Sequence, residues 1–190
     1  MAGVELTLLR PDEPEGLLDE EAFAIDEFMP YWAELWPSSL ALAGALPERL
    51  AGVRVIELGC GLGVPSLVAA ARGAEVTALD WADDAIGLLR ENADRNGIEL
   101  EAVTGDWRTF SGWYDLALGA DLLYEARNGA ALLRVLPLLS PEVLLADPGR
   151  PYAREFFERA TNGWTVEELG DLVYRLTRAT RAGRPARGGE

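Results

Sequence analysis

The sequence contains no histidine and no lysine, and its single cysteine is Cys60. The absence of histidine removes the commonest general base and metal ligand, and it excludes every Ser-His-Asp or Cys-His hydrolase. One cysteine excludes an internal disulfide and a multi-cysteine metal site, so we expect no metal centre. Because Cys60 lies between two glycines, we interpret it as a small residue that fills a turn rather than as a nucleophile.

Long apolar segments are also missing. The sequence has no run of about 18 apolar residues and no basic-then-apolar pattern at its N-terminus. We therefore expect a soluble, cytoplasmic protein with no membrane partner. The chain has 190 residues and neither a long linker nor an internal repeat, so a single domain with a substantial core is expected.

Basic charge is scarce, and the formal net charge is −15. Residues 1–36 hold ten acidic side chains and one arginine, whereas the last sixteen residues hold five arginines and one glutamate. So acidic a chain is poorly suited to bind phosphates, and we expect no nucleic-acid partner. The charge suits a cationic substrate, although we favour a solvated acidic surface as its explanation. We expect a monomer or a weak oligomer.

Residues 53–80 form the most informative stretch of the sequence. An apolar, β-branched run predicts a buried strand, a glycine-rich turn follows it, and an alanine-rich helix leads to a second strand. Proline near the start of the helix and glycine after its end mark its limits. In order, these features are Val53–Leu58, the glycines at 59, 61 and 63, a helix between Pro65 and Gly73, and Glu75–Asp80.

The glycine turn and Asp80 together predict a site for a nucleotide-like ligand. Glycine has no Cβ, so its backbone can approach a ligand closely. Asp80 lies 21 residues after Gly59, at the end of the second strand, where a carboxylate can accept both hydroxyls of a ribose. The alternative is a strand-to-helix turn that needs glycine only for its own geometry.

Two motifs resemble those of a known family. The turn reads G-x-G-x-G, with Glu57 just before it, and resembles motif I of the class I (seven-β-strand) methyltransferases that use S-adenosylmethionine. The preceding Pro30-Tyr-Trp-x-x-Leu-Trp-Pro-Ser-Ser-Leu-Ala-Leu-Ala segment is similar to the small protein-lysine methyltransferase branch, which includes the methyltransferases of the electron-transfer flavoprotein β-subunit and of chaperones. This resemblance covers roughly residues 28–150.

The resemblance implies an α/β fold with a Rossmann-like, seven-stranded, mostly parallel sheet, a closing antiparallel hairpin, and helices on both faces. We expect an acidic extension over residues 1–27, in which Asp19–Phe28 can form a short helix, a methyltransferase domain over 28–178, and a disordered tail over 179–190. Further helices are expected over Ser38–Leu46, about 82–95, about 125–136 and from Pro151. Further strands are expected over Leu100–Thr104, Tyr114–Ala120, Glu142–Ala146, Trp164–Leu169 and Leu172–Arg178.

The resemblance also implies site residues. Asp121 and Tyr124 match the family's Asp-x-x-Tyr segment and are the expected catalytic residues, whereas Asp106 and Trp107 match the positions that meet the adenine. Alternatively, Asp121 caps the helix at about 125–136, and Asp106 and Trp107 are a turn and a core residue. The predicted residues for S-adenosyl-L-methionine, whose product is S-adenosyl-L-homocysteine, are Trp36, Glu57, Gly59, Gly61, Gly63, Asp80, Trp81, Asp106, Trp107 and Ala120.

Further side chains are candidates for contact with the methyl acceptor. Tyr31, Trp32 and Trp36 either cover an edge of the core or flank a cation. Glu34 and Glu125 join Asp121 and Tyr124 as groups that can hold or deprotonate an amine. The Asp147–Arg150 stretch is first of all a turn, and its functional role stays open.

We therefore predict methyl transfer from S-adenosylmethionine to a lysine amine of a protein. One alternative is methylation of a small-molecule amine or another metabolite. A nicotinamide-dependent oxidoreductase is disfavoured by the short glycine spacing and the closing hairpin. A different class is a non-catalytic module that keeps the fold for cofactor binding or regulation.

Overall fold

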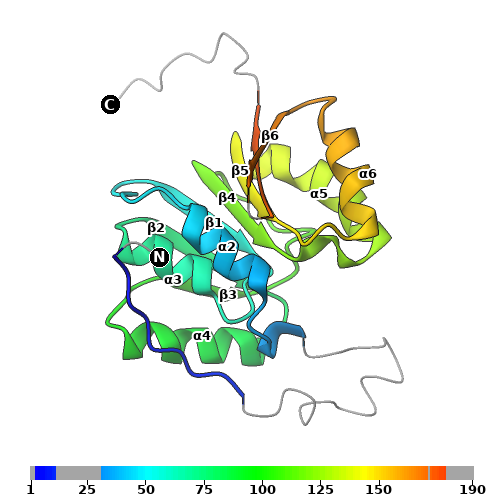
Figure 1. The fold of residues 1–190 in the computed structure, drawn as a ribbon. Coiled ribbons are helices and arrows are strands. Elements are labelled where there is room, and N and C mark those ends of the chain that lie inside the picture. Colours follow the sequence, from blue (N-terminus) through cyan, green and yellow to red (C-terminus); the bar gives the residue numbers. More distant parts are fainter. Residues whose placement is uncertain (1–2, 12–30, 171, 179–190) are drawn as a thin grey trace, which may run out of the picture.

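The computed structural model describes residues 3–11, 31–170 and 172–178, so the expectations for Asp19–Phe28 and for residues 179–190 lie outside the described residues. Helices and strands follow one another along the described chain in the order that the sequence predicts (Figure 1). Their bounds are η2 Tyr31–Ala33, α2 Pro37–Ala45, β1 Arg54–Leu58, α3 Val64–Ala71, β2 Glu75–Asp80, α4 Asp83–Arg95, β3 Glu101–Thr104, β4 Leu116–Ala120, η3 Leu122–Tyr124, α5 Ala126–Leu139, β5 Glu142–Ala146, α6 Pro151–Ala160, β6 Thr165–Gly170 and β7 Val173–Thr177.

All seven of these strands join one sheet, in the order β3-β2-β1-β4-β5-β7-β6. Neighbouring strands from β3 to β5 are parallel, whereas β7 runs antiparallel to both β5 and β6. This confirms the predicted fold class, a mostly parallel sheet with a closing antiparallel hairpin. The chain reverses its direction of progress across the sheet between β1 and β4, which is where ligands bind in open α/β sheets.

Helices cover both faces of the sheet, and side chains alternate between the faces along each strand (Figure 1). Val55 and Leu118 pack with residues of α2 and α3, whereas Ile56 and Ala117 pack with residues of α5 and α6. Helix α4 packs beside α3 on the first face. Burial on both faces explains why the central strands read as continuous apolar runs in the sequence.

Predicted element bounds agree with the structure within two residues, except at the end of α5. That helix was expected to stop before Pro137 but continues to Leu139. Proline in a last turn removes only one N–H from the helical hydrogen bonds. Leu136 and Leu139 are both fully buried against the sheet, and we attribute the extra residues to this packing.

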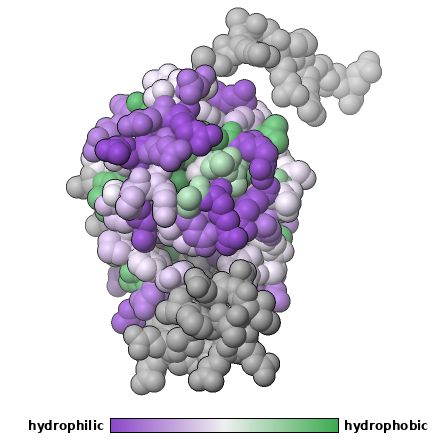
Figure 2. Space-filling model, turned by 90° about the vertical axis from the view of Figure 1, so that its right-hand side faces the viewer, coloured by the Kyte–Doolittle hydropathy of each residue, from purple (hydrophilic) through white to green (hydrophobic). Residues whose placement is uncertain are grey.

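The outer face of α6 is charged. Ala153, Phe156 and Ala160 are buried at helical spacing, whereas the residues between them form exposed ion pairs such as Arg159–Glu155. Figure 2 shows that this side of the molecule is largely hydrophilic, with small apolar areas between polar side chains. Within the described ranges, no helix is long and apolar enough to cross a lipid bilayer.

Residues 3–11 run in an extended conformation along α4 (Figure 1). Val4, Leu6 and Leu8 alternate with exposed residues and pack against the helices of this face. Asn92, which is fully buried on α4, accepts a hydrogen bond from the Leu9 amide at 2.6 Å and donates one to the Leu9 carbonyl at 3.0 Å. The N-terminal segment is therefore part of the packed structure over residues 3–11.

Replacing Asn92 with alanine should lower the free energy of unfolding by about 1–3 kcal/mol, because the Leu9 amide and carbonyl both lose their partner. Urea denaturation of the two proteins measures this difference. Asn162→Ala is the matched control, since its side chain is exposed and bonds only to the Arg159 carbonyl at the end of α6. Equal losses in the two variants would show that the contact between Asn92 and residue 9 contributes nothing specific.

Candidate active site

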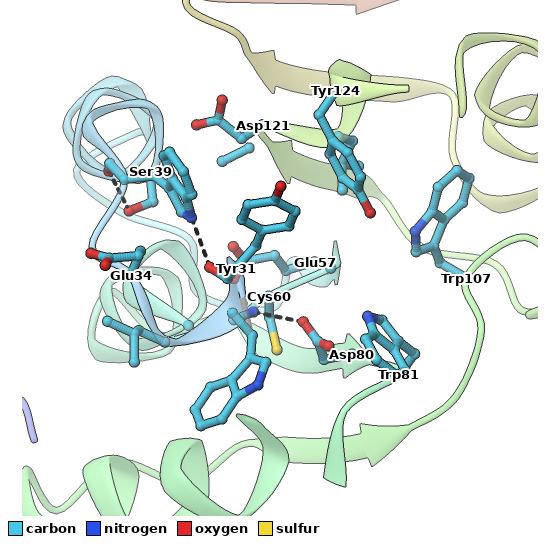
Figure 3. Close-up of a pocket in the computed structure, with 18 of the residues that line it drawn as sticks. Tyr31, Glu34, Ser39, Glu57, Cys60, Asp80, Trp81, Trp107, Asp121 and Tyr124 are labelled. Carbon is cyan, nitrogen blue, oxygen red and sulfur yellow. Dashed lines mark hydrogen bonds between the residues drawn. The ribbon is translucent and has the colours of Figure 1, made fainter. Parts of the chain in front are cut away.

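A cavity of about 690 Å³ opens at the carboxyl ends of β1, β2 and β4 (Figure 3). The residues that follow these strands line it from one side, and the segment around η2 and the start of α2 lines it from the other. This volume lies within the range of about 300–1,000 Å³ that is typical of small-molecule sites. The cavity is therefore the candidate active site.

The glycine loop between β1 and α3 forms one wall of the cavity. Gly59, Gly61 and Gly63 all have positive φ, at 60°, 50° and 67°. A Cβ on Gly61 would lie 3.0 Å from the Trp32 carbonyl oxygen, and one on Gly63 would lie 2.4 Å from a methyl group of Leu89. Glycine at these positions thus serves the packing of η2 and α4 as well as the turn itself.

Asp80, at the end of β2, is joined directly to this loop. Its Oδ2 accepts a hydrogen bond from the Gly61 amide at 2.8 Å (Figure 3). Its Oδ1 accepts one from the Ala82 amide at 3.0 Å. Burial raises the pKa of Asp80, and the two backbone hydrogen bonds oppose that shift. The carboxylate is therefore held in one orientation, at the cavity wall where a ribose was predicted.

Glu57 lies on β1, next to β2, and caps α3 from outside the helix. Gly63 is the N-cap residue and has no side chain, so Glu57 Oε2 instead accepts hydrogen bonds from the Ser66 amide, at 2.9 Å, and from the Ser66 hydroxyl. Burial raises the pKa of Glu57 to about 8, and the nearby charge of Asp80 adds to the shift. Glu57 thus links β1, α3 and the cavity floor.

Asp121 lies directly after β4 and does not cap the following helix. The alternative of a capping role for Asp121 is therefore wrong. Helix α5 begins at Ala126 with Glu125 as its N-cap, and the Asp121 side chain makes no capping hydrogen bond to the short helix η3. Its backbone is left-handed, with φ 57°, which is uncommon for a residue other than glycine. That conformation carries the Asp121 side chain to the cavity, where it bonds to Arg150.

Arg150 is a site residue that our list of predicted residues omits. Its Nε and Nη2 both donate to Asp121 Oδ1, at 3.1 and 2.8 Å, and its guanidinium lies 5.7 Å from the centre of the Trp36 ring. Asp147, directly after β5, fixes the turn that leads to Arg150, because its Oδ1 accepts hydrogen bonds from the Gly149 and Arg150 amides, both at 2.8 Å. The sequence could have indicated Arg150 through its position after β5, because β5 pairs with β4 and the residues after the two strands lie at the same edge of the sheet.

Aromatic side chains line the mouth of the cavity. The Tyr31 ring lies 6.2 Å from Trp36 and 5.9 Å from Tyr124, and the Trp36 indole donates a hydrogen bond to the Tyr31 carbonyl at 2.8 Å. Half of the Tyr31 surface is exposed. Trp32 and Glu34 line the same wall, so the aromatic segment lies at the cavity rather than only at an edge of the core.

Besides Glu57, the side chains of Tyr124 and Cys60 stay protonated at neutral pH. Burial, together with the negative charge of Glu125, raises the pKa of Tyr124, so its hydroxyl serves as a donor rather than a base. Burial also raises the pKa of the Cys60 thiol well above its ordinary value. A buried, protonated thiol is a poor nucleophile, in agreement with the interpretation of Cys60 as a turn residue.

The structure brings all but one of the predicted site residues to the cavity. The exception is Asp106, which does not line it, because the Asp106 carboxylate accepts a hydrogen bond from the Arg108 amide at 2.8 Å and pairs with the Arg108 side chain at 3.4 Å. Trp107, in contrast, is buried in the core and still lines the cavity. The other predicted residues at the cavity are Trp36, Glu57, Gly59, Gly61, Gly63, Asp80, Trp81, Ala120, Asp121 and Tyr124.

Comparison with known proteins agrees with this geometry. Residues 55–141, from β1 to the start of the β5 region, match the family model described as a methyltransferase domain. Over these residues the chain is similar to methyltransferases. The cavity lies within the elements that the match covers, apart from the η2–α2 segment and Arg150.

Two proteins to which this chain is similar are protein-lysine methyltransferases by name. The electron transfer flavoprotein beta subunit lysine methyltransferase of Danio rerio is 36% identical over 132 residues, which cover 64% of this chain and 51% of the relative. Protein N-lysine methyltransferase METTL21A of Danio rerio is 39% identical over 121 residues, which cover 57% and 55%. The chain thus spans about half the length of the curated relatives it matches.

A solved structure shares the fold of this chain. Magnesium protoporphyrin IX methyltransferase from Synechocystis PCC 6803, determined with bound S-adenosylmethionine, superposes with a TM-score of 0.60. The two chains are 21% identical, and the match covers 75% of this chain and 76% of the other. At this identity the likeness supports the fold alone.

The raised pKa of Glu57 predicts a pH-dependent stability. The folded chain keeps the Glu57 proton up to a pKa of about 8, whereas an unperturbed glutamate releases it near 4.5. The folded state therefore binds more protons between these values, and the free energy of unfolding should fall by up to ~1.4 kcal/mol per pH unit as pH rises through this window.

Glu57→Gln should remove this slope, because the glutamine carbonyl can still accept from Ser66 but does not titrate. Urea denaturation at pH values of about 5.5 and 7.5 measures the difference for both proteins. Glu75→Gln, an exposed change at the start of β2, should keep the wild-type slope. Parallel slopes for wild type and Glu57→Gln would contradict the assignment of a buried, protonated Glu57.

Proposed function

We propose that the chain transfers a methyl group from S-adenosylmethionine to a lysine amine of a protein. The observation that carries the proposal is the convergence of the glycine loop, Asp80 and Asp121 on one cavity at the ends of β1, β2 and β4. Named relatives that methylate protein lysines give the acceptor class.

The cavity residues fit S-adenosylmethionine. Asp80 presents a buried, fixed carboxylate that would accept the two ribose hydroxyls. The faces of Trp81 and Trp107 would flank the adenine, and the glycine loop would lie beside the methionine part of the molecule. When bound, this group supplies a methyl carbon that is already activated by the positive charge on sulfur.

The chain's own residues align and prepare the acceptor. The amine nitrogen uses its lone pair to form the new N–C bond, while the C–S bond breaks and its electron pair goes to sulfur. Only an uncharged amine has that lone pair, so the acceptor must first lose a proton. No histidine is available, and Tyr124 stays protonated, which leaves the carboxylates of Asp121, Glu34 and Glu125 to orient the amine and pass its proton toward solvent. Alignment itself can supply several kcal/mol of the barrier.

A cationic protein segment suits the mouth of the cavity. Tyr31, Trp36 and Tyr124 present aromatic faces on which the stem and the charge of a lysine can pack. The net charge of −15 attracts basic partners over a longer range. These features favour lysine over an uncharged metabolite.

The proposed activity is tested by incubating the full chain and labelled S-adenosylmethionine with a lysate of undermethylated proteins. We expect label in a discrete protein band, at a lysine residue by mass spectrometry. Label confined to small molecules would support the alternative of metabolite methylation. Cofactor binding without any transfer would contradict an enzymatic role and favour a binding module.

Asp121→Asn should reduce this transfer by at least tenfold and leave the affinity for S-adenosylhomocysteine within a factor of about two, because the change removes a charge at the acceptor side of the cavity. Asparagine is the suitable replacement because it tolerates the left-handed backbone of this position. Full transfer by the variant would remove Asp121 from the catalytic residues.

Asp80→Asn should weaken S-adenosylhomocysteine binding by about ten- to a hundredfold, since hydrogen bonds to a charged group are worth roughly 1.5–3 kcal/mol. Calorimetric titration of the full chain measures the change. Asp84→Asn, on the exposed first turn of α4, is the matched control and should bind as the wild type does. Unchanged affinity in Asp80→Asn would reject the ribose assignment.

A further inference from the structure

The position that would receive the acceptor's charge already holds a cation. Arg150 donates two hydrogen bonds to Asp121 Oδ1 and lies over the face of Trp36. A carboxylate and an aromatic face are the two groups that a lysine ammonium would seek in this cavity. The Arg150 side chain is 31% exposed and that of Asp121 is 9% exposed, so the pair lies at the cavity wall rather than on the open surface.

No other cationic side chain among the residues described at the cavity is paired with Asp121. Glu125 is engaged by Arg127, and the Asp147 Oδ1 is held by the turn that precedes α6. Asp80 and Glu57 lie deeper, on the side of the glycine loop, and both have raised pKa values because of burial. The titratable and charged groups that face the cavity are Tyr31 and Glu34 from the η2–α2 segment, Glu57 and Cys60 from β1 and its loop, Asp80 from β2, Asp121, Tyr124, Glu125 and Arg127 from the region after β4, and Arg150 from the region after β5.

We propose that Arg150 is a positioning residue that neutralises Asp121 and thereby makes the site favour the uncharged form of an amine placed beside it. An ammonium that enters meets a fixed guanidinium in place of an open carboxylate. Like charges a few ångströms apart disfavour each other's charged forms, and this is one way in which proteins obtain a neutral amine near neutral pH. The inference rests on the proposed function and specifies how a site without histidine prepares its nucleophile.

Sinefungin tests the inference without any acceptor protein. This analogue of S-adenosylmethionine carries a primary amine in place of the S-methyl group, whereas S-adenosylhomocysteine carries neither. The ratio of the two affinities therefore isolates the effect of an amine at the transfer position. The full chain, Arg150→Gln and Arg150→Lys are titrated with both compounds by calorimetry at pH values of about 7 and 9.

For the wild type, the affinity for sinefungin relative to S-adenosylhomocysteine should rise with pH, because the neutral amine binds better. Arg150→Gln exposes the Asp121 carboxylate to the amine, so at neutral pH the relative affinity should increase by about tenfold and its pH dependence should shrink or reverse. Arg150→Lys keeps the positive charge and should retain the wild-type pattern. Arg159→Gln, which breaks an exposed ion pair on α6, is the matched control and should also retain it.

A gain of affinity cannot result from a damaged fold, and unchanged S-adenosylhomocysteine binding would show that the cofactor site is intact. An unchanged or lower affinity ratio in Arg150→Gln would overturn the inference and leave the proposed function standing. Failure of the wild-type chain to bind either compound would overturn both. Methyl transfer to a protein, with no effect of Arg150→Gln on the ratio, would reject only the role of Arg150.

Discussion

The hydrogen bond from the Gly61 amide to the Asp80 carboxylate joins the carboxyl ends of β1 and β2, and the rest of the site is arranged around that junction. The loop follows a path with three positive φ angles, which brings it close enough to η2 and α4 that a Cβ at Gly61 or Gly63 would collide with them. Glu57 then fixes the start of α3, because the N-cap glycine has no side chain to do so. This backbone junction thus sets the wall and the floor of the cavity and the position of the carboxylate that we propose binds the ribose.

The opposite wall depends on strand order. Because β4 pairs with β1 on one side and with β5 on the other, the residues that follow β4 and β5 meet beside the glycine loop. Asp121 reaches this place through a left-handed backbone, and Arg150 reaches it through a turn that Asp147 holds. The result is a cavity with a fixed carboxylate at each end and a guanidinium paired to only one of them.

Much of the fold could be predicted because burial on both faces of a parallel sheet leaves continuous apolar runs in the sequence. The glycine pattern located the loop, and the separation of 21 residues from Gly59 located Asp80 at the end of the next strand. Asp106 could not be placed in this way, since the direction of its carboxylate is decided by Arg108, two residues later in a turn. The acidic composition of residues 1–27 also concealed the alternation of Val4, Leu6 and Leu8, which pack along the helices.

We propose that this cavity is the S-adenosylmethionine site, with Asp80 on the ribose and Asp121 at the side where the methyl group is transferred. A crystal structure of the full chain with S-adenosylhomocysteine tests it most directly. We expect both ribose hydroxyls within hydrogen-bond distance of the Asp80 carboxylate and the sulfur atom facing the Asp121–Arg150 pair. A ligand bound with its ribose away from Asp80, or with its sulfur turned from Asp121, would contradict the account.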